Sequence, residues 1–543
     1  MPAAAGRAAR SGLAGFSASP PCLAWGVGET WGVGGRAGAL RRAQRAGAPL
    51  VRRAPEGRPR RGGLPAALAG TVPESGGGDG GDGAGGGGAG RWRLPVVLRV
   101  EGIFRPNSQD AAIAALALPA LAAVAFEPFM SLVDTAIVAR LGTAPLAGVG
   151  LSGLFFTIST FLFSFLVSAV TPAVGKAHAR GDEVAVSRTV ACGLILAGGM
   201  GALALVGLVA AGPWGLVHVM RAGPDVLPFA KAYFWGRLWA LPLALMQFVC
   251  MGAFRGVGDT RTPLAATALG SAVNVTLDVA FVFGLGWGVF GAAVASSLAQ
   301  AASLALLLAL LVHRGHLRPN DLRELPRAKE MAPVLLAGAA LSTRSMASMA
   351  AVTFATSSVA VLGAAPLAAH EILRQVFMLG AMAVEPLGIS AQALVSRARG
   401  RGDLEGALQV ANRLLQLALC TGCCSGLVVV LFAPLYSAQV SADAAVVALT
   451  HLTIPLLAFF QPVEAVMAVS DHVLYGADDH PAVARGMVVA AALCVSALAC
   501  VKRSNYNLLT VWACLKVLSS GRFVNNIRRL TSKSSPLLQP LQA

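Results

Sequence analysis

Charged residues are scarce in this chain: Asp, Glu, Lys and Arg make up 13% of its 543 residues, against about 25% in ordinary soluble domains. Apolar residues make up 55%, and the mean hydropathy is +0.66. Long apolar stretches can therefore reach the roughly 20 residues that a membrane-spanning helix needs. The composition excludes an ordinary soluble globule and predicts an all-α protein that crosses a membrane many times.

Aromatic residues are also few, at 6% of the chain. Cages of aromatic rings recognise large organic cations, so this shortage is mild evidence against such a substrate. No nucleophile–base pair and no set of metal ligands stands out along the sequence. We therefore expect neither an enzyme nor a bound metal or cofactor.

Acidic residues are nearly absent from the first 61 residues, which hold eleven arginines, no lysine and only Glu29 and Glu56. This composition is typical of an organellar transit peptide, and we assign residues 1–75 to a leader. Residues 76–93 are a glycine-rich linker. A plain disordered tail is the alternative. Binding to nucleic acid is not expected, because no aromatic residues alternate with the arginines.

Hydrophobic runs separated by charges or by Gly and Pro clusters predict two groups of membrane spans. Residues 110–315 hold six spans, and residues 330–501 hold five. Positive charge falls on alternate loops, which places the N-terminus in the cytoplasm-like compartment, the stroma in a chloroplast. The spans begin near residues 113, 147, 190, 228, 264, 288, 332, 367, 408, 444 and 484.

The two groups repeat one another. Leu141-Gly-Thr-Ala-Pro-Leu-Ala147 returns 221 residues later as Leu362-Gly-Ala-Ala-Pro-Leu-Ala368, and the Arg-Gly-Asp ending at Asp182 returns at Asp403 with the same offset. Repeats of this length in apolar segments indicate two related helical bundles. Such a pair is the architecture of a secondary transporter.

The end of the chain departs from the repeat. The counterpart of the sixth span should begin near residue 506, but residues 502–543 carry seven Lys or Arg and no acid. We interpret them as an altered basic tail and expect the twelfth helix to be missing. A short interfacial or re-entrant element at residues 508–518 is the alternative.

Asp134 is the strongest candidate for a functional charge, because a carboxylate at the end of an apolar run is costly unless it has a task. It could take up and release a proton, or bind Na⁺ through oxygen ligands. The alternative is a helix-end residue that caps the next turn.

Asn274 and Asp278 stand four residues apart in the fifth span and so project from one face of a helix. Together with a carboxylate from the first span they could complete a site for the coupling cation. Hydrogen bonding between helices is the alternative.

Other polar residues in the spans are candidates for a central cavity that binds substrate. Glu127 and Glu385 each precede a proline, which frees a backbone carbonyl and can bend the helix. Arg344 could bind an anion, since a guanidinium presents a two-pronged fork to carboxylates. A last cluster could contact substrate or form a satisfied structural network of its own: His370, Glu371 and Arg374.

Several ordered motifs resemble the multidrug and toxic compound extrusion (MATE) family over about residues 110–500. Ser-Leu-Val-Asp-Thr-Ala-Ile-Val-Ala-Arg-Leu-Gly, at residues 131–142, is similar to its first-helix region. Arg-Gly-Val-Gly-Asp-Thr-Arg-Thr-Pro at 255–263 and Gly-Val-Phe-Gly-Ala-Ala-Val-Ala at 288–295 match its later signature. With the arginine-rich leader, the chain most resembles the family's plant chloroplast members.

The resemblance implies two six-helix bundles around a cleft, and an antiporter driven by H⁺ or Na⁺. Asp134 matches the family's cation-coupling carboxylate, and Asn274 and Asp278 match its fifth-helix polar pair. We expect export of an organic acid, phenolic or xenobiotic across a plastid membrane, with membrane lipids as the other partner. The oligomeric state stays open. The alternative is a truncated, non-transporting isoform that binds or titrates a partner transporter.

Overall fold

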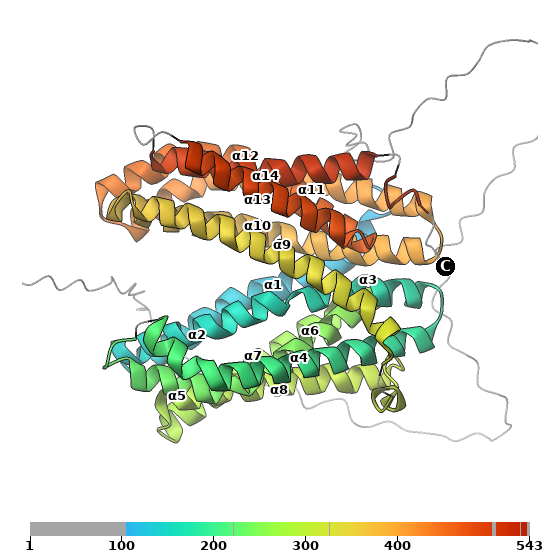
Figure 1. The fold of residues 1–543 in the computed structure, drawn as a ribbon, viewed down its shortest axis with the longest axis horizontal. Coiled ribbons are helices and arrows are strands. Elements are labelled where there is room, and N and C mark those ends of the chain that lie inside the picture. The colour runs from blue at the N-terminus through green and yellow to red at the C-terminus, as the bar shows by residue number, and fades with distance from the viewer. Residues whose placement is uncertain (1–104, 221, 325, 502–505, 533, 540–543) are drawn as a thin grey trace, which may run out of the picture. The chain divides into compact units, whose positions relative to one another are not determined.

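A computed structural model describes residues 105–543, apart from 221, 325, 502–505, 533 and 540–543. The leader assigned to residues 1–75 and the linker at 76–93 lie outside the described residues. The described residues all belong to one compact unit. In its described part the regular structure is entirely helical (Figure 1), which confirms the predicted fold class.

The first bundle follows the predicted order of spans. Two of its spans are interrupted, because α2 passes into α3 at Ser164 and α5 passes into α6 at Trp239. Its elements are α1 (Asp110–Ala139), α2 (Thr143–Phe163), α3 (Phe165–Ala179), α4 (Glu183–His218), α5 (Leu227–Leu238), α6 (Ala240–Val257), α7 (Arg261–Asp278), the π-helix η1 (Val279–Gly284) and α8 (Gly288–His313).

The second bundle repeats this arrangement with longer, unbroken helices. Figure 1 shows α10 to α14 as the upper group and α2 to α8 as the lower one, with α1 and α9 at their boundary. Its elements are α9 (Ala328–Ala360), α10 (Ala364–Gly400), α11 (Leu404–Val440), α12 (Ala444–Gly476), α13 (His480–Cys500) and α14 (Leu508–Thr531).

The repeated sequence motifs form the turns between helices. Gly181 and Gly402 have φ values of 75° and 76°, a left-handed conformation that glycine adopts without strain. The next residue caps the following helix: Asp182 accepts a hydrogen bond from the Ala185 amide at 2.9 Å, and Asp403 accepts one from the Gly406 amide at 2.7 Å. The repeated Arg-Gly-Asp motif therefore forms the same kind of helix start in both bundles.

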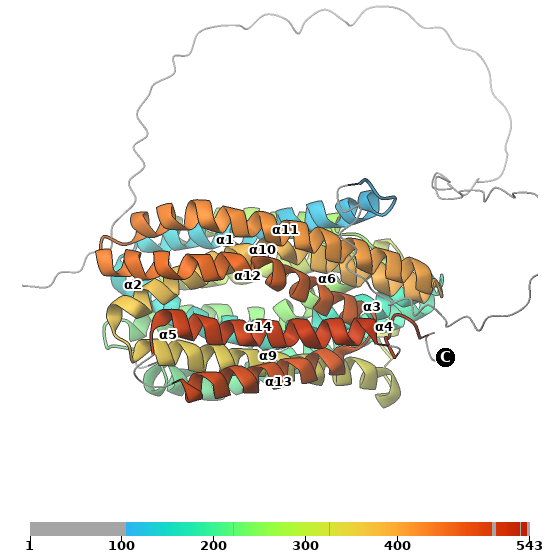
Figure 2. The same ribbon diagram turned by 90° about the horizontal axis from the view of Figure 1, so that it is seen from above.

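The helix α14 corrects the expectation that the last helix is missing. Over the described residues, eleven helices are long and apolar enough to cross a membrane, the number that hydropathy predicts. Yet Leu508–Thr531 forms a further helix, which packs against α12 and α13 (Figure 2). It begins with a capping box in which Asn507 and Thr510 bond each other's backbone amides.

Polar contacts with α12 explain why a basic segment fits inside the bundle. Lys516 Nζ lies 3.0 Å from Glu464 Oε1, and Arg522 forms an ion pair with Asp471. A hydropathy scale scores each of these charged residues as unfavourable in a membrane span, because it takes no account of the partner that offsets the loss of hydration. The charged residues that form these ion pairs explain why hydropathy does not identify α14, the sixth helix of the second bundle.

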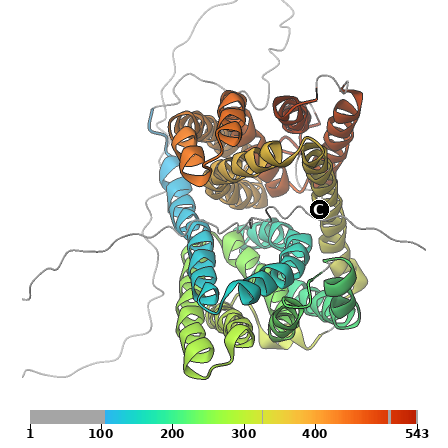
Figure 3. The same cartoon turned by 90° about the vertical axis from the view of Figure 1, so that its left-hand side faces the viewer.

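The two bundles are joined at the end where α3, α10 and α12 terminate, here termed the basic face. Lys176 Nζ lies 2.5 Å from Asp478 Oδ2 across the two bundles. The Gln392 side chain donates a hydrogen bond of 2.6 Å to the Ser168 carbonyl. Helix α1, blue in Figure 3, contacts both α7 and α10. A movement of α1 would therefore alter its contacts with both bundles.

Candidate functional site

The predicted polar residues of α1 and α7 meet inside the first bundle. Asp134 and Asn274 lie on the wall of one cavity of about 570 Å³. Asp134 and Asp278 are close enough to interact directly. Asn274 and Asp278 are buried, at 7% and 2% exposure. The sequence therefore predicted correctly that these three side chains gather, while their role in cation coupling stays a prediction.

An arginine that the sequence analysis did not single out completes this cluster. Arg237 of α5 exerts its positive charge on both Asp134 and Asp278. One oxygen of each carboxyl and Nη1 of Arg237 are buried without a hydrogen-bond partner among the described residues. The rule that drew attention to Arg344, a guanidinium inside an apolar span, would have found Arg237 as well.

The charge of this cluster explains what it can bind. Two ionised carboxylates and one guanidinium leave a surplus of one negative charge within the described cluster. Like-charged carboxylates in a dehydrated space repel each other strongly, so the arrangement favours uptake of one further cation. A proton shared by the two carboxyls, or a Na⁺ held between them, would balance the site.

Beside apolar residues, the cavity wall carries several further hydrogen-bonding groups. Asn274 donates a hydrogen bond of 3.2 Å to the Ser296 hydroxyl. Gln300 donates one of 3.1 Å to the Gln247 side chain. Arg255 of α6 also lines the cavity. The wall therefore offers amides and guanidinium groups to a bound solute beside the carboxyl pair.

Arg344 does not stand free as an anion ligand, because it is paired inside the second bundle. Its Nη2 lies 3.0 Å from Asp471 Oδ2, and Arg522 pairs with the same carboxylate. Asn526 donates a further hydrogen bond of 2.7 Å to Asp471 Oδ1. Asp471 is thus fully partnered, and this group of described charges has a positive surplus where the first bundle has a negative one.

Glu385 lies between the two bundles. It acts electrostatically on Arg255 of the first bundle and on Arg344 of the second. Its side chain is 46% exposed, and its Oε1 lies 3.8 Å from His472 Nε2. That Glu385 lines a central cavity stays a prediction. The side chain of Glu127, its predicted counterpart in α1, lies outside what the structure describes.

The cluster at the start of α10 forms local contacts and does not line the Asp134 cavity. Arg374 and Glu371 form an ion pair of 2.5 Å. His370 is buried, and its Nε2 lies 3.1 Å from the Thr356 hydroxyl. These contacts support the structural interpretation of the cluster over a role in binding substrate.

Two repeated helical bundles, a charged cavity within one of them and an acidic side chain between them define a secondary transporter. The MatE family matches residues 119–280 and 333–501. The chain belongs to this family, whose members are transporters and not enzymes, and which bind small organic substrates in the membrane.

Individual relatives agree with this membership. The chain is 30% identical over 439 residues to Protein DETOXIFICATION 44, chloroplastic, of Arabidopsis thaliana, covering 78% of this chain and 82% of that protein. It is 28% identical over 466 residues to Protein DETOXIFICATION 45, chloroplastic, of the same plant, covering 82% of each. The plant chloroplast resemblance expected from the sequence is thereby confirmed.

Solved structures show the same fold. A MOP superfamily transporter from Pyrococcus furiosus superposes with a TM-score of 0.69 at 21% identity, covering 78% of this chain and 95% of that one. The Vibrio cholerae MATE transporter VcmN in its bent form gives a TM-score of 0.70 at 18% identity, covering 80% and 99%. These neighbours confirm the two-bundle architecture.

Proposed function

We propose that this protein is a cation-coupled antiporter that exports an organic solute across a plastid membrane in exchange for H⁺ or Na⁺. The observation that carries the proposal is the Asp134–Asp278 pair beside Arg237. Its surplus negative charge gives the first bundle a place to load one cation. The second bundle offers no equivalent among the described residues, since its Asp471 already holds two guanidinium groups.

Cation binding would act on the bundles through α1 and α7. Loading the pair removes the repulsion between Asp134 and Asp278 and so favours a closer packing of the two helices. The backbone directly after Asp278 is the π-helix η1, a wider turn that is frequent at functional sites. Because α1 also contacts α10, the two cation states would favour different arrangements of the bundles. A solute that prefers one of them is then released by the cation.

The cavity wall supports a solute that carries a carboxylate or a phenolic oxygen. Arg255, which is not part of the cluster of Asp134, Asp278 and Arg237, supplies positive charge, and Gln247 and Gln300 supply hydrogen-bonding amides. A guanidinium matches the two oxygens of a carboxylate. An organic acid or a phenolic compound fits this wall better than a large organic cation does.

A plastid membrane is supported by the relatives named chloroplastic and by the arginine-rich leader. With the basic loops on the stromal side, the solute would leave the stroma. The alternative of a non-transporting isoform depended on a missing twelfth helix. Since α14 packs in the second bundle, that alternative loses its supporting observation.

Transport in proteoliposomes tests the proposal. The full chain is reconstituted, a proton or a sodium gradient is imposed separately, and efflux of a labelled aromatic carboxylate is followed. We expect Asp134→Asn and Asp278→Asn to abolish the gradient-driven flux. Asp225→Asn, which changes an exposed loop carboxyl, is the matched control and should transport normally. Unchanged gradient-driven flux in both site variants would show that the pair does not couple transport.

A further inference from the structure

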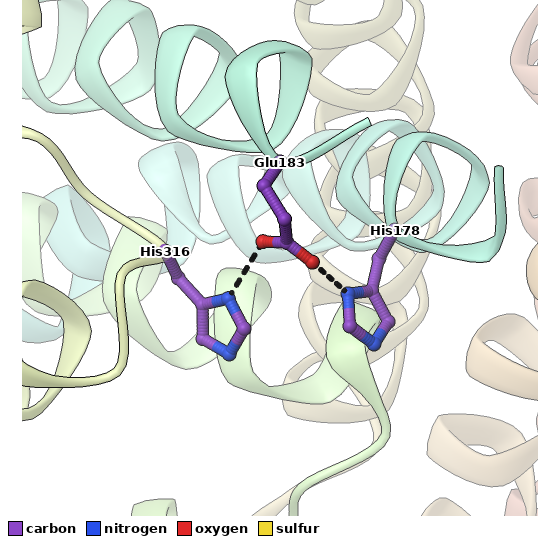
Figure 4. Close-up of side chains that lie close together, drawn as sticks. All are labelled: His178, Glu183 and His316. Atoms are coloured by element: carbon purple, nitrogen blue, oxygen red, sulfur yellow. Dashed lines mark hydrogen bonds and ion pairs between the residues drawn. The ribbon is translucent and has the colours of Figure 1, made fainter. Parts of the chain in front are cut away.

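Three side chains from separate segments meet at the basic face of the first bundle (Figure 4), and none of them lines the cavity beside Asp134. His178 lies in the last turn of α3, and Glu183 is the first residue of α4. His316 lies just beyond the end of α8. No metal site is evident from the sequence, because His316 is more than a hundred residues from the other two.

The three side chains point at one another. His178 Nδ1 lies 3.0 Å from one Glu183 oxygen, and His316 Nδ1 lies 3.1 Å from the other. One ligand atom from each residue lies within 4.8 Å of the other two. Zinc bonds of about 2.0–2.2 Å to nitrogen and oxygen set tetrahedral ligand atoms roughly 3.3–3.6 Å apart. Small side-chain rotations therefore suffice to place one ion between all three.

The backbone holds the three residues in place. Gly181, with its left-handed φ, and the Asp182 cap form the turn that brings Glu183 next to His178. The His316 amide donates to the Leu311 carbonyl at 2.9 Å, and the Arg318 amide donates to the Ser187 hydroxyl at 2.8 Å. The segment after α8 is thus fixed to α4, and little rearrangement is needed on binding.

We propose that His178, Glu183 and His316 bind a divalent transition metal ion of the Zn²⁺ type. Two imidazoles and one carboxylate are the ligand set that zinc and its first-row neighbours prefer, whereas Mg²⁺ and Ca²⁺ prefer oxygen ligands throughout. The side chains are 29%, 41% and 15% exposed, so an ion and a water as fourth ligand have access. A purely structural cluster, with Glu183 accepting two hydrogen bonds, would not respond to metal.

A bound ion would strengthen the first bundle at the face where the bundles close. It would connect α3, α4 and the segment after α8, which are otherwise linked here by hydrogen bonds. Lys176, which forms the 2.5 Å contact with Asp478 across the bundles, lies two residues before His178 in the same helix. Metal occupancy would therefore steady the helix end that supplies this contact.

Calorimetric titration of the purified full chain in detergent tests the proposal, after chelator treatment and removal of any histidine tag. We expect one Zn²⁺ per chain at this site and no saturable Mg²⁺ binding. His178→Gln and His316→Gln should each weaken Zn²⁺ binding by more than about tenfold, the lower bound seen even for changes around a metal's ligands. His313→Gln alters an exposed histidine three residues from His316 and should bind as the unmodified protein does.

Gel filtration and thermal melting without metal show whether each variant is folded. Should one histidine variant fail to fold, Glu183→Gln takes its place, because it keeps the side-chain volume and removes the anionic ligand. The proposal is overturned by an unmodified protein that binds no Zn²⁺. Equal binding by the folded ligand variants and by His313→Gln would also overturn it, since the ion would then be bound elsewhere.

Discussion

Arg529 Nε lies 2.5 Å from Asp479 Oδ2, and this ion pair joins the end of α14 to the turn between α12 and α13. The first bundle has the same pair at the same place, where Arg314 Nη1 lies 2.5 Å from Asp259 Oδ2. In each case the sixth helix of a bundle is tied to the turn before the fifth. The basic tail therefore completes the second bundle as α8 completes the first.

The Asp259 turn should make stability depend on pH. Burial alone would raise the pKa of Asp259, but hydrogen bonds from Thr262 and the charge of Arg314 outweigh burial and hold the pKa below its ordinary value. Because the folded pKa is depressed, the carboxylate stabilises the fold above about pH 4, the unfolded value. That stabilisation is lost as the pH falls through the lower folded value.

We therefore expect Asp259→Asn to melt at a lower temperature than the unmodified protein at pH 7. The difference between the two melting temperatures should become smaller as the pH approaches 3. Thermal melting of the detergent-solubilised chain across this range is the measurement. Asp225→Asn, at an exposed loop position, should follow the unmodified protein throughout. A constant difference between Asp259→Asn and the unmodified protein at every pH would contradict this assignment.

The buried pair between α12 and α14 should be sensitive to the loss of one partner. Glu464 accepts from Lys516 at 3.0 Å and from the Ser519 hydroxyl at 2.5 Å, and the Lys516 side chain is only 4% exposed. Removing one charge leaves the other buried and unpaired, which costs about 3–5 kcal/mol. Lys516→Met should therefore melt at a clearly lower temperature.

The double variant Lys516→Met with Glu464→Met should recover most of that loss, because no charge is then left unpaired. Glu371→Gln, which breaks the exposed pair with Arg374, is the comparison and should shift melting little. If the loss of stability in the double variant equals the sum of the losses in the two single variants, the side chains contribute independently. The pairing itself would then not stabilise the fold.

The sequence revealed those features that depend on spacing along one segment. Apolar periodicity gave eleven spans, the repeat gave two bundles, and the cost of charge in an apolar span identified Asp134 and Asp278. It did not reveal α14, because the partners of Lys516 and Arg522 lie on another helix and hydropathy counts residues one at a time. The contact of His316 with Glu183 likewise depends on how the segment after α8 packs against α4.

Arg237 provides the sharpest test of the charge balance in the first bundle. Its guanidinium acts on both Asp134 and Asp278, so it repels a cation that enters between them. Arg237→Gln removes this repulsion while keeping a polar side chain of similar reach. We expect the concentration of coupling cation that half-saturates transport to fall several-fold, and the release of the cation on the other side to slow. The maximal flux should then decrease.

Lys231→Gln is the matched control, since Lys231 is an exposed cation near the start of the same helix and should leave both quantities unchanged. Flux in proteoliposomes, measured at a series of cation concentrations, separates the half-saturating concentration from the maximal rate. If Arg237→Gln lowers only the affinity for the organic solute, the guanidinium binds the solute and does not set the cation affinity. A lower half-saturating cation concentration with slower turnover would instead place Arg237 beside the coupling cation, as its electrostatic interaction with both Asp134 and Asp278 indicates.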